Sequence, residues 1–472
     1  MRDGQTGTQR IPESVDVLVI GGGNAAMCAA LAARHEGASV LVLEGAPEHF
    51  RGGNSRHTRD VRYLHTRKNA YVTGLYLEDE FWDDLIRVTG GKTDEPLARL
   101  TLRNSEDLDV WMADHGVKWQ KPLRGTLHLA RTNLFMLGGG RGMMNGFYET
   151  ARRMGITILY DAGCEDLVVQ HGVFDHAVVR IDGERREIRA KALVAAAGGF
   201  EANIDWLKEY WGDAADNYII RGTPYNTGTV LKSLLERGAM TTGDPREFHA
   251  VAVDARAPKF DGGIVTRLDS VPFGIVVNRD GERFYDEGED FWPKRYAIWG
   301  GLIAREPGQE AYSIIDADVI DKFMPSVFAP IEAPTVGDLA AKMGLDPAKV
   351  TAAVDMFNAS IRPGTFQPGE LDDCRTEGLT PPKSHWAVPI KQPPFYGYPL
   401  RPGITFTYMG VKVDDHARII MHDGRPSPNM TAAGELMAGN ILGKGYLAGF
   451  GLTIGAVFGR IAGKEAAANA RR

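Results

Sequence analysis

The stretch VDVLVIGGGNAA, residues 15–26, decides the fold of this chain. Its first half, Val15 to Ile20, is almost entirely apolar and rich in β-branched residues, which is typical of a buried parallel strand. Residues 24–36 then have the composition of a helix, and residues 38–44 (ASVLVLE) have the pattern of a second buried strand. The order strand, glycine turn, helix and strand predicts a βαβ unit, whose crossover we expect to be right-handed.

The glycine turn has the spacing G-x-G-x-x-A of a dinucleotide-binding loop. Gly21 permits the tight turn, Gly23 lets the backbone approach a pyrophosphate, and Ala26 is small enough for the helix to pack on the strand. The free N–H groups at the start of the helix favour an anion. Glu44, at the end of the second strand, can accept both hydroxyls of an adenosine ribose. We therefore predict contacts to a dinucleotide at Gly21, Gly23, Asn24, Ala25, Ala26, Glu44 and Gly45.

Length and composition limit the alternatives. A chain of 472 residues is too long for one ordinary core, so we expect two domains. The 54 basic and 61 acidic residues give a net charge of −7, which argues against a nucleic-acid partner. The three cysteines lie far apart in the sequence and form no metal-binding motif, and so few thiols are typical of a protein in the reducing cytoplasm. The polar N-terminus and the absence of a long apolar run predict a soluble, cytoplasmic protein.

The pattern of the chain changes twice. From about residue 248 to residue 398 it is rich in Pro, Asp and Gly loops with scattered aromatic residues. Before this stretch, residues 78–88 and 97–115 are candidates for amphipathic helices, and a long helix is expected over residues 452–470. We predict an α/β fold with a Rossmann-type domain formed by residues 1–247 and 399–472. An α+β domain, residues 248–398, is inserted in it.

Three later segments add to the first turn: RGGNS at residues 51–55, AAAGGFEAN at residues 195–203 and TAAGE at residues 431–435. With the glycines of the terminal helix, they resemble the flavoprotein family of fumarate reductase, succinate dehydrogenase and 3-ketosteroid dehydrogenase over nearly the whole chain. The resemblance implies FAD, with GGNS at the flavin ring and Glu435 at the ribitol. Additional cofactor contacts are then expected at Gly52, Gly53, Asn54, Ser55, Gly198, Gly199, Asn203, Gly434, Glu435, Gly451, Leu452 and Thr453.

The need to hold a long cofactor also favours FAD over NAD. A flavin must be bound at its pyrophosphate, its ribitol and its ring, whereas an NAD enzyme would leave the C-terminal glycine-rich segments unexplained. Some members of the family carry a covalent flavin linkage, for which His49 is poorly placed. We therefore expect non-covalent FAD.

Within the family, the loop GGNSRHTR at residues 52–59 and the run at residues 439–451 resemble those of tricarballylate dehydrogenases. The implied reaction removes two hydrogens from adjacent carbons of a small polycarboxylate, tricarballylate giving cis-aconitate. A hydride goes to flavin N5 and a base takes the neighbouring proton. Arg56 and Arg59 can pair with substrate carboxylates in a bidentate manner, or face solvent or phosphate. His57, between them, is either a clamp or base, or a structural histidine.

Four further residues are candidates for catalysis. The resemblance implies that the inserted residues 248–398 are the mobile capping domain of the family, which closes over the substrate. Arg283 lies in a segment, residues 281–287, that resembles the G-x-R-F-x-x-E motif of this capping domain. In fumarate reductases an arginine a little further on transfers the proton, and Arg295 is the nearest candidate, although the spacing requires an insertion. An arginine in that role needs an acidic relay. Tyr446 resembles the tyrosine of ketosteroid dehydrogenases and can bind a carboxylate or simply pack. His249, at the entrance to the capping domain, is equally compatible with a structural and a catalytic role.

Other functions remain open at this point. One alternative is the reduction of an activated double bond, as in fumarate or acrylate reductases. Another is the desaturation of a ketone such as a steroid. It can also be a flavin electron-transfer module of a larger assembly, without a small substrate of its own. As an enzyme it would need a separate electron acceptor, for which the resemblance suggests a membrane-associated redox protein, with oxygen as the alternative.

Overall fold

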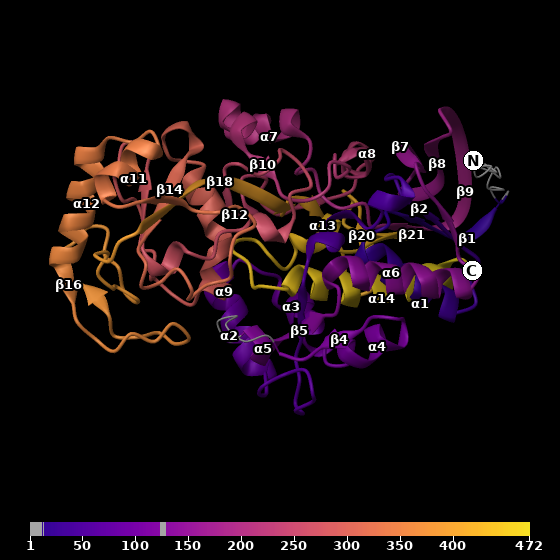
Figure 1. Cartoon of the computed structure of the whole chain (residues 1–472). Helices are drawn as coiled ribbons and strands as arrows, with labels where there is room; N and C mark the ends of the chain where they lie inside the picture. The colour runs from indigo at the N-terminus through magenta and orange to yellow at the C-terminus, as the bar shows by residue number, and fades with distance from the viewer. Residues whose placement is uncertain (1–11, 13, 123–128) are drawn as a thin grey trace, which may run out of the picture.

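The computed structural model describes residue 12, residues 14–122 and residues 129–472. Its main body is built on an eight-stranded sheet (Figure 1). Six strands follow the order β20, β21, β9, β1, β2, β6, and the pairs β21–β9, β9–β1, β1–β2 and β2–β6 are parallel. Their bounds are β20 Arg418–Ile420, β21 Pro426–Ala432, β9 Glu184–Ala195, β1 Val15–Ile20, β2 Val40–Leu43 and β6 Thr157–Leu159.

The first βαβ unit lies at the centre of this sheet, as the sequence predicts. β1 is paired on both sides, with Val19 opposite Val42 of β2 and Val194 of β9. Strand β2 is wholly buried, which explains why its sequence lacks alternation. The connecting helix α1, Asn24–His35, is buried along most of its length and packs under α14, Phe450–Asn469.

Glycines allow α14 to approach α1 closely. A methyl group at Gly459 would lie 2.5 Å from the carbonyl oxygen of Ala25, and one at Gly463 would lie 2.1 Å from that of Ala29. Such distances leave no room for a side chain, because both neighbours are backbone atoms. The two helices are therefore held together by backbone contact along one glycine-lined face of α14.

We predict that Gly463→Ala lowers the free energy of unfolding by about 1–3 kcal/mol, because the added methyl forces the two helices apart. Thermal unfolding of the purified variant measures the change. Gly301→Ala is the matched control, since the atom nearest to its added methyl is 3.5 Å away on a flexible arginine. Equal melting temperatures for Gly463→Ala and the wild type would show that the contact is not tight.

The remaining helices and strands of the main body surround the sheet. β7, Gly163–Gln170, and β8, Val173–Ile181, form an antiparallel extension on β9. A smaller sheet contains β3 Asp60–Arg62, β5 Asn133–Met136 and β4 Trp119–Gln120. The helices are α2 Glu78–Thr89, α3 Glu95–Arg103, α4 Leu108–Asp114, α5 Leu129–Thr132, α6 Gly139–Arg153, α7 Ile204–Trp211, α8 Thr229–Glu236 and α13 Glu435–Ala438. Short strands β11 Thr241–Thr242 and β19 Gly410–Val411 pair with each other.

One helix prediction is wrong. Residues 97–115 were expected to form one helix, and the structure divides them between α3 and α4. The break occurs at Ser105, which is fully buried. Its hydroxyl accepts a hydrogen bond from the backbone N–H of Leu64 at 2.9 Å and donates one to Leu102 O. This tertiary contact explains a break that the local pattern does not show.

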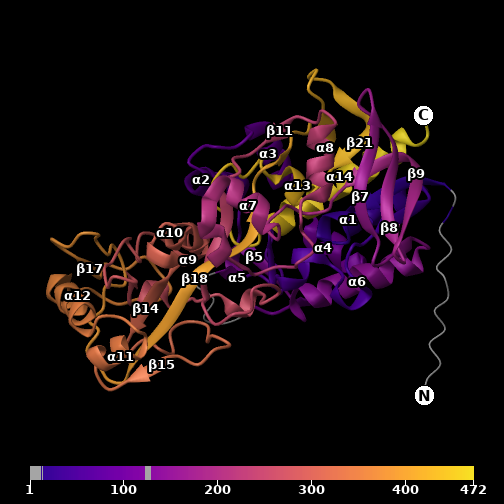
Figure 2. The same cartoon turned by 90° about the horizontal axis from the view of Figure 1, so that it is seen from above.

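A second sheet of six strands extends away from the body (Figure 2). Its spine is the 13-residue strand β18, Phe395–Thr407, which runs from the outer lobe into the body. The strands that pair with β18 are β10 Ile219–Ile220, β12 Phe248–Asp254, β14 Ala311–Ile315 and β15 Ile331–Ala333, and β13 Ile275–Asn278 pairs with β14. Because β18 spans both regions, it ties the outer lobe to the cofactor side of the body.

The outer lobe has a hydrophobic cluster of its own. Helices α11, Val336–Lys342, and α12, Pro347–Ser360, pack there, with Phe357 and Ile314 fully buried. The other elements of this region are α9 Trp292–Arg295, α10 Trp299–Ile303, β16 Ile361–Arg362 and β17 Arg375–Thr376. A separate core is what an inserted domain requires. We retain residues 248–398 as the proposed limits of that domain.

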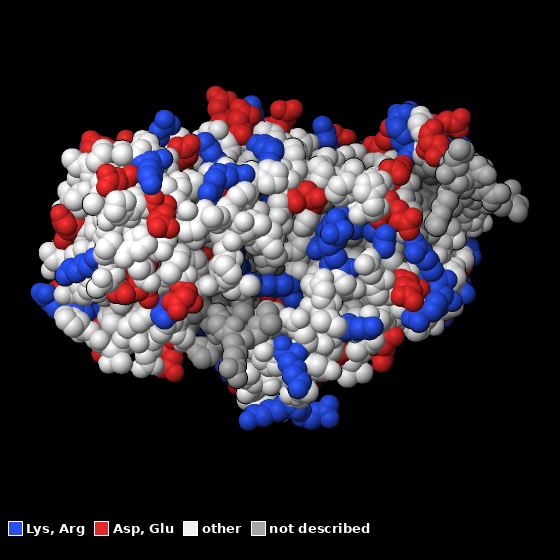
Figure 3. All heavy atoms as spheres, viewed as in Figure 1, with Lys and Arg blue, Asp and Glu red and all other residues white. Residues whose placement is uncertain are grey.

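The surface and the helices add two observations. On the face seen in Figure 3, basic and acidic side chains are interspersed, in keeping with the small net charge. Among the described residues, no helix has both the length and the apolar composition needed to cross a membrane.

Candidate functional site

A cavity of about 560 Å³ opens at the carboxyl ends of the parallel strands. Its wall combines the turn after β1, the end of β2, the loop after β9, the residues around Gly434 after β21 and the start of α14. The outer lobe closes one end with side chains such as His249, Arg267 and Tyr296. The carboxyl edge of an open parallel sheet is where such folds bind their ligands.

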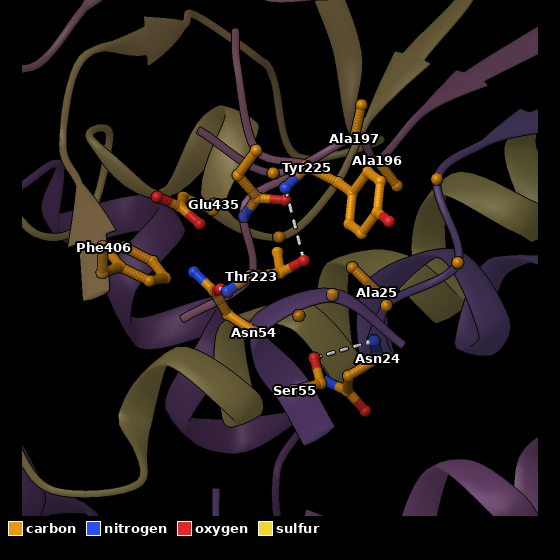
Figure 4. A pocket seen from close by; sticks show the side chains of 18 of the residues that line it. Asn24, Ala25, Asn54, Ser55, Ala196, Ala197, Thr223, Tyr225, Phe406 and Glu435 are labelled. Atoms are coloured by element: carbon orange, nitrogen blue, oxygen red, sulfur yellow. Dashed lines mark hydrogen bonds between the residues drawn. The ribbon is translucent and has the colours of Figure 1, made fainter. Parts of the chain in front are cut away.

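The turn after β1 has the geometry of a phosphate-binding loop. Gly21 has φ of +112°, and a side chain there would lie 2.2 Å from Ala196 O. Gly23 caps α1 without any side-chain hydrogen bond to the first turn. The N–H of Asn24 donates to Ser55 Oγ at 3.0 Å, which joins this turn to the GGNS loop (Figure 4). The start of α1 thus offers N–H groups and a positive dipole end to an anion in the cavity.

Glu44 is buried at the end of β2 and lines the cavity. Its carboxylate accepts hydrogen bonds from the N–H of Gly52 at 2.9 Å and of Ala46 at 3.0 Å, and Tyr148 donates a longer one at 3.3 Å. Burial raises the pKa of Glu44, and these donors partly offset that rise. The side chain therefore has a fixed position from which an adenosine ribose can be bound.

The GGNS loop is joined to three other segments through Asn54. Its amide donates to Glu201 Oε1 at 2.5 Å and to Thr405 O at 2.7 Å, and its carbonyl oxygen accepts the N–H of Thr223 at 2.8 Å. Asn54, Thr223 and Glu435 surround the same part of the cavity in Figure 4. This arrangement fits the ring and ribitol of a flavin, because later loops complete the site begun by the first turn.

Most predicted cofactor residues line this cavity. They are Gly21, Gly23, Asn24, Ala25, Glu44, Gly45, Gly53, Asn54, Ser55, Gly198, Gly434, Glu435, Gly451 and Leu452.

Five predicted cofactor residues, all within the described part of the chain, do not line the cavity: Ala26, Gly52, Gly199, Asn203 and Thr453. They support it instead. Ala26 is buried in α1, and Gly52 donates its N–H to Glu44. Gly199 leaves room for Glu435, Asn203 caps α7, and Thr453 hydrogen-bonds to Gly449 O at 3.3 Å.

The predicted catalytic residues divide in the same way. Arg59, His249 and Tyr446 line the cavity. Arg56 does not: its guanidinium carbon lies 5.0 Å from the ring centre of Phe50, and its Nη1 donates to His49 O. His57 lies against Asp261, away from the wall. Arg56 and His57 are thus each engaged with neighbouring groups of the protein outside the cavity wall.

Arg283 and Arg295 also lie outside the cavity wall. Arg283 forms a buried ion pair with Glu287 at 2.5 Å and donates to Pro381 O at 2.7 Å. Arg295 donates its Nε to Glu289 at 2.8 Å. Both guanidinium groups are thus engaged within the outer lobe. Their role in catalysis stays a prediction from the sequence.

Sequence reasoning missed three cavity residues, Arg221, Arg267 and Tyr296. Arg221 follows β10 and is 5% exposed, and its buried Nε and Nη1 have no hydrogen-bond partner among the described residues. Burial lowers the pKa of Arg221 to about 10, so it still carries its charge at neutral pH. None of the three belongs to a local motif. A single buried arginine gives no signal until the fold places it in a cavity.

Arg267 is held in a fixed orientation. Its Nη2 donates to Asp269 at 2.8 Å, and Trp292 Nε1 donates to the other oxygen of the same carboxylate at 2.6 Å. The guanidinium carbon lies 4.6 Å from the ring centre of Tyr296. The pairing leaves one edge of Arg267 directed to other partners, as in sites that recognise carboxylates.

His249 and Tyr446 form a stacked pair beside these arginines. Their ring centres are 3.9 Å apart and their planes differ by 4°. The register of β12 on β18 shifts between His249 and Ala250, a bulge that can direct the imidazole inward. Burial, followed by the charges of Arg221 and Arg267, lowers the pKa of His249 well below its usual value. The imidazole is therefore neutral at neutral pH.

The two-sheet architecture, the anion-binding turn and the loops along the cavity define a Rossmann-type flavin-binding protein. The family model described as "FAD binding domain" matches residues 16–452, so the chain belongs to this family and FAD is its cofactor. The expected resemblance to the fumarate reductase and succinate dehydrogenase flavoproteins is confirmed, as is the predicted fold class.

Three comparisons illustrate the relationship. An NADH:fumarate oxidoreductase of Klebsiella pneumoniae is 27% identical over 477 residues, which cover 98% of this chain and 49% of that protein. The chain thus spans about half the length of this relative. The open conformation of a flavocytochrome c3 fumarate reductase has a TM-score of 0.76 at 24% identity, with 98% and 79% of the two chains covered. A 3-ketosteroid-Δ4-(5α)-dehydrogenase of Rhodococcus jostii RHA1 has a TM-score of 0.72 at 21% identity, with 98% and 99% covered.

We predict that Glu44→Gln weakens FAD binding roughly 10- to 100-fold, the equivalent of losing one hydrogen bond to a charged group. Titration of the FAD-free protein with FAD, followed by flavin fluorescence, measures the dissociation constant. Glu36→Gln, on the exposed end of α1, is the control and should bind FAD like the wild type. An unchanged dissociation constant for Glu44→Gln would exclude the ribose contact.

A second prediction concerns the linkage of the cofactor. His49 is exposed and does not line the cavity. We therefore expect acid precipitation to release the yellow flavin entirely into the supernatant. Colour that remains in the washed protein pellet would show a covalent bond.

Proposed function

We propose that this protein is an FAD-dependent oxidoreductase that acts on the CH–CH group of a small polycarboxylate. Tricarballylate, oxidised to cis-aconitate, is the best single substrate. The class of reaction is supported by the family and by the names of relatives, which include a fumarate oxidoreductase and 3-oxosteroid dehydrogenases. The choice of a polycarboxylate rests on the cavity itself.

The observation that carries this choice is the group of arginines at the lobe end of the cavity. Arg59, Arg221 and Arg267 all line it. Two of them have nearby carboxylates: Arg59 lies 3.5 Å from Asp60, and Arg267 pairs with Asp269. Arg221 retains two buried nitrogen atoms that have no partner in the part of the chain that the structure describes. A buried cation without a partner is costly, and a bound substrate carboxylate would supply that partner.

We propose a separate part in the reaction for each of the side chains at this end of the cavity. When bound, FAD supplies a hydride acceptor at its N5 atom. The arginines hold the carboxylates and so fix which C–H bond faces the cofactor. A neighbouring carbon must lose a proton at the same time. The neutral imidazole of His249 can accept it at this wall, beside Tyr296 and Tyr446, whose phenols stay protonated because burial raises their pKa. The lobe side chains also keep water from the reacting carbons.

The same arginines weigh against the steroid alternative. A steroid site should be apolar around the ring to be oxidised, and a steroid would leave Arg221 Nε and Nη1, which lack a partner among the described residues, still unpaired. Reduction of a fumarate-type double bond is the second candidate, because it needs the same carboxylate contacts in the reverse direction. For oxidation of the substrate we propose a separate electron acceptor, a redox protein or oxygen, and for reduction a redox protein that supplies the electrons.

We predict that tricarballylate, mixed with the oxidised protein in the absence of oxygen, bleaches the flavin absorbance. Arg267→Gln should raise the tricarballylate concentration at half-maximal bleaching about 10- to 100-fold, because one charged hydrogen-bond pair is lost. Stopped-flow absorbance measures both effects. The control is Arg246→Gln, whose side chain is 72% exposed, and it should behave like the wild type.

The outcome separates the candidates. Bleaching by a ketosteroid and not by tricarballylate would overturn the polycarboxylate proposal. Oxidation of a dye-reduced flavin by fumarate, with no effect of tricarballylate, would favour the reductase. No response to any of the three would favour a flavin electron-transfer module.

A further inference from the structure

Two buried carboxyl groups meet behind the cofactor side of the cavity. Glu201 is 0% exposed and Glu435 is 8% exposed. Glu201 follows the glycines after β9, and Glu435 follows Gly434 after β21. Because β9 and β21 are adjacent and parallel, their carboxyl-end loops leave the sheet side by side. The topology of the fold therefore brings two acidic residues together that lie far apart in the sequence.

The hydrogen bonds around this pair leave one oxygen atom without a donor. Glu201 Oε1 accepts the amide N–H groups of Asn54 at 2.5 Å and of Asn226 at 2.7 Å. Glu435 Oε1 accepts the N–H of Thr407 at 2.7 Å and its hydroxyl at 3.1 Å. Glu201 Oε2 is buried and receives no donor from the described residues. Glu435 lies against the loop that carries Glu201, since a side chain at Gly199 would lie 2.3 Å from Glu435 Oε1. One proton between the two carboxyls would supply the missing donor.

The surroundings favour one shared proton. The groups that face the pair are Asn54 from the GGNS loop, Asn226 from the segment before α8, and Thr407 and Tyr408 from the end of β18. The amides and the hydroxyl are neutral, and burial raises the pKa of Tyr408 well above its usual value, so its phenol is neutral too. Two adjacent buried carboxylates cannot both remain ionised at low cost.

The two carboxyls differ in their contacts, which decides where the proton resides. Burial, and then the charge of Glu201, raises the pKa of Glu435 well above its usual value. Burial raises the pKa of Glu201 as well, although the hydrogen bonds that it accepts favour its ionised form. Two amides donate to Glu201 Oε1, and its Oε2 lacks a donor among the described residues, which favours Glu435 as the acid that donates and Glu201 as the carboxylate that accepts.

We propose that Glu201 is a positioning residue of the FAD site, which accepts a hydrogen bond from a protonated Glu435 and so keeps that side chain neutral beside the cofactor. Glu435 lines the cavity and Glu201 does not. The negative charge is therefore held one layer behind the wall. The same Glu201 carboxylate fixes the amide of Asn54, which lines the cavity from the GGNS loop.

The consequence concerns the cofactor. A negative charge next to a flavin opposes the gain of electrons, by an amount that grows in a buried, low-dielectric site. Keeping Glu435 neutral therefore keeps the reduction potential of bound FAD higher than an ionised Glu435 would. This role depends on FAD binding and not on the identity of the substrate.

The test compares two isosteric variants. In Glu201→Gln, the new amide N–H can donate to Glu435, which then no longer needs its proton and ionises. We expect the reduction potential of bound FAD to fall. In Glu435→Gln, a neutral amide replaces the neutral acid and can donate to Glu201, so we expect a potential close to that of the wild type. Glu209→Gln, exposed on α7, is the control. Equilibration with reference dyes measures each potential without any substrate.

Infrared difference spectra supply a second measurement. At neutral pH the wild type and Glu209→Gln should show the carbonyl stretch of a buried carboxylic acid, and both site variants should lack it. The proposal is overturned if the wild type has no such band, or if Glu435→Gln lowers the potential and Glu201→Gln does not. Should Glu201→Gln fail to fold, the spectra of the wild type and Glu435→Gln still decide whether Glu435 is protonated. A failure here leaves the tricarballylate assay unaffected, because neither measurement uses substrate.

Discussion

The parallel pairing of β9 with β1 on one side and β21 on the other is the constraint on which the site depends. It makes all three strands end at the same edge. The turn after β1 then lies directly against the loop after β9, so closely that Gly21 has no space for a side chain beside Ala196. One cavity can be lined by the turn after β1, the loop after β9 and the residues around Gly434 only because these strand ends are aligned.

Strand β18 extends this arrangement to the outer lobe. It pairs with β12, β14 and β15 in the lobe and ends next to the cofactor loops, where Thr405 accepts a hydrogen bond from Asn54. Residues of both regions therefore meet across a short distance. Because β12 pairs with β18 near the end of that strand, His249 of β12 lies in the wall of the same cavity as the cofactor loops.

The two ends of the cavity have opposite electrostatic character. At the lobe end, arginines are gathered with fewer carboxylates than they can bind, and two nitrogen atoms of Arg221 lack a partner among the described residues. On the side of Gly434, Glu201 and Glu435 are buried together, and we propose that they share a proton. One end thus favours an anionic ligand, whereas the other limits negative charge beside the cofactor. Both effects are strong because burial removes the screening that water would provide.

Local sequence determined the cofactor half of this protein. Strand β1, the G-x-G-x-x-A turn and Glu44 lie within 30 consecutive residues, so their spacing alone predicted the Rossmann-type domain and five of the residues that line the cavity. The tertiary structure decided the lobe end of the cavity. Arg221, Arg267 and Tyr296 come from separate segments, and Arg56, His57, Arg283 and Arg295, which look promising in sequence, are engaged elsewhere. The physical reason is that contacts within a βαβ unit are short-range and leave a periodic pattern. A buried charge cluster depends on which distant loops the sheet brings together.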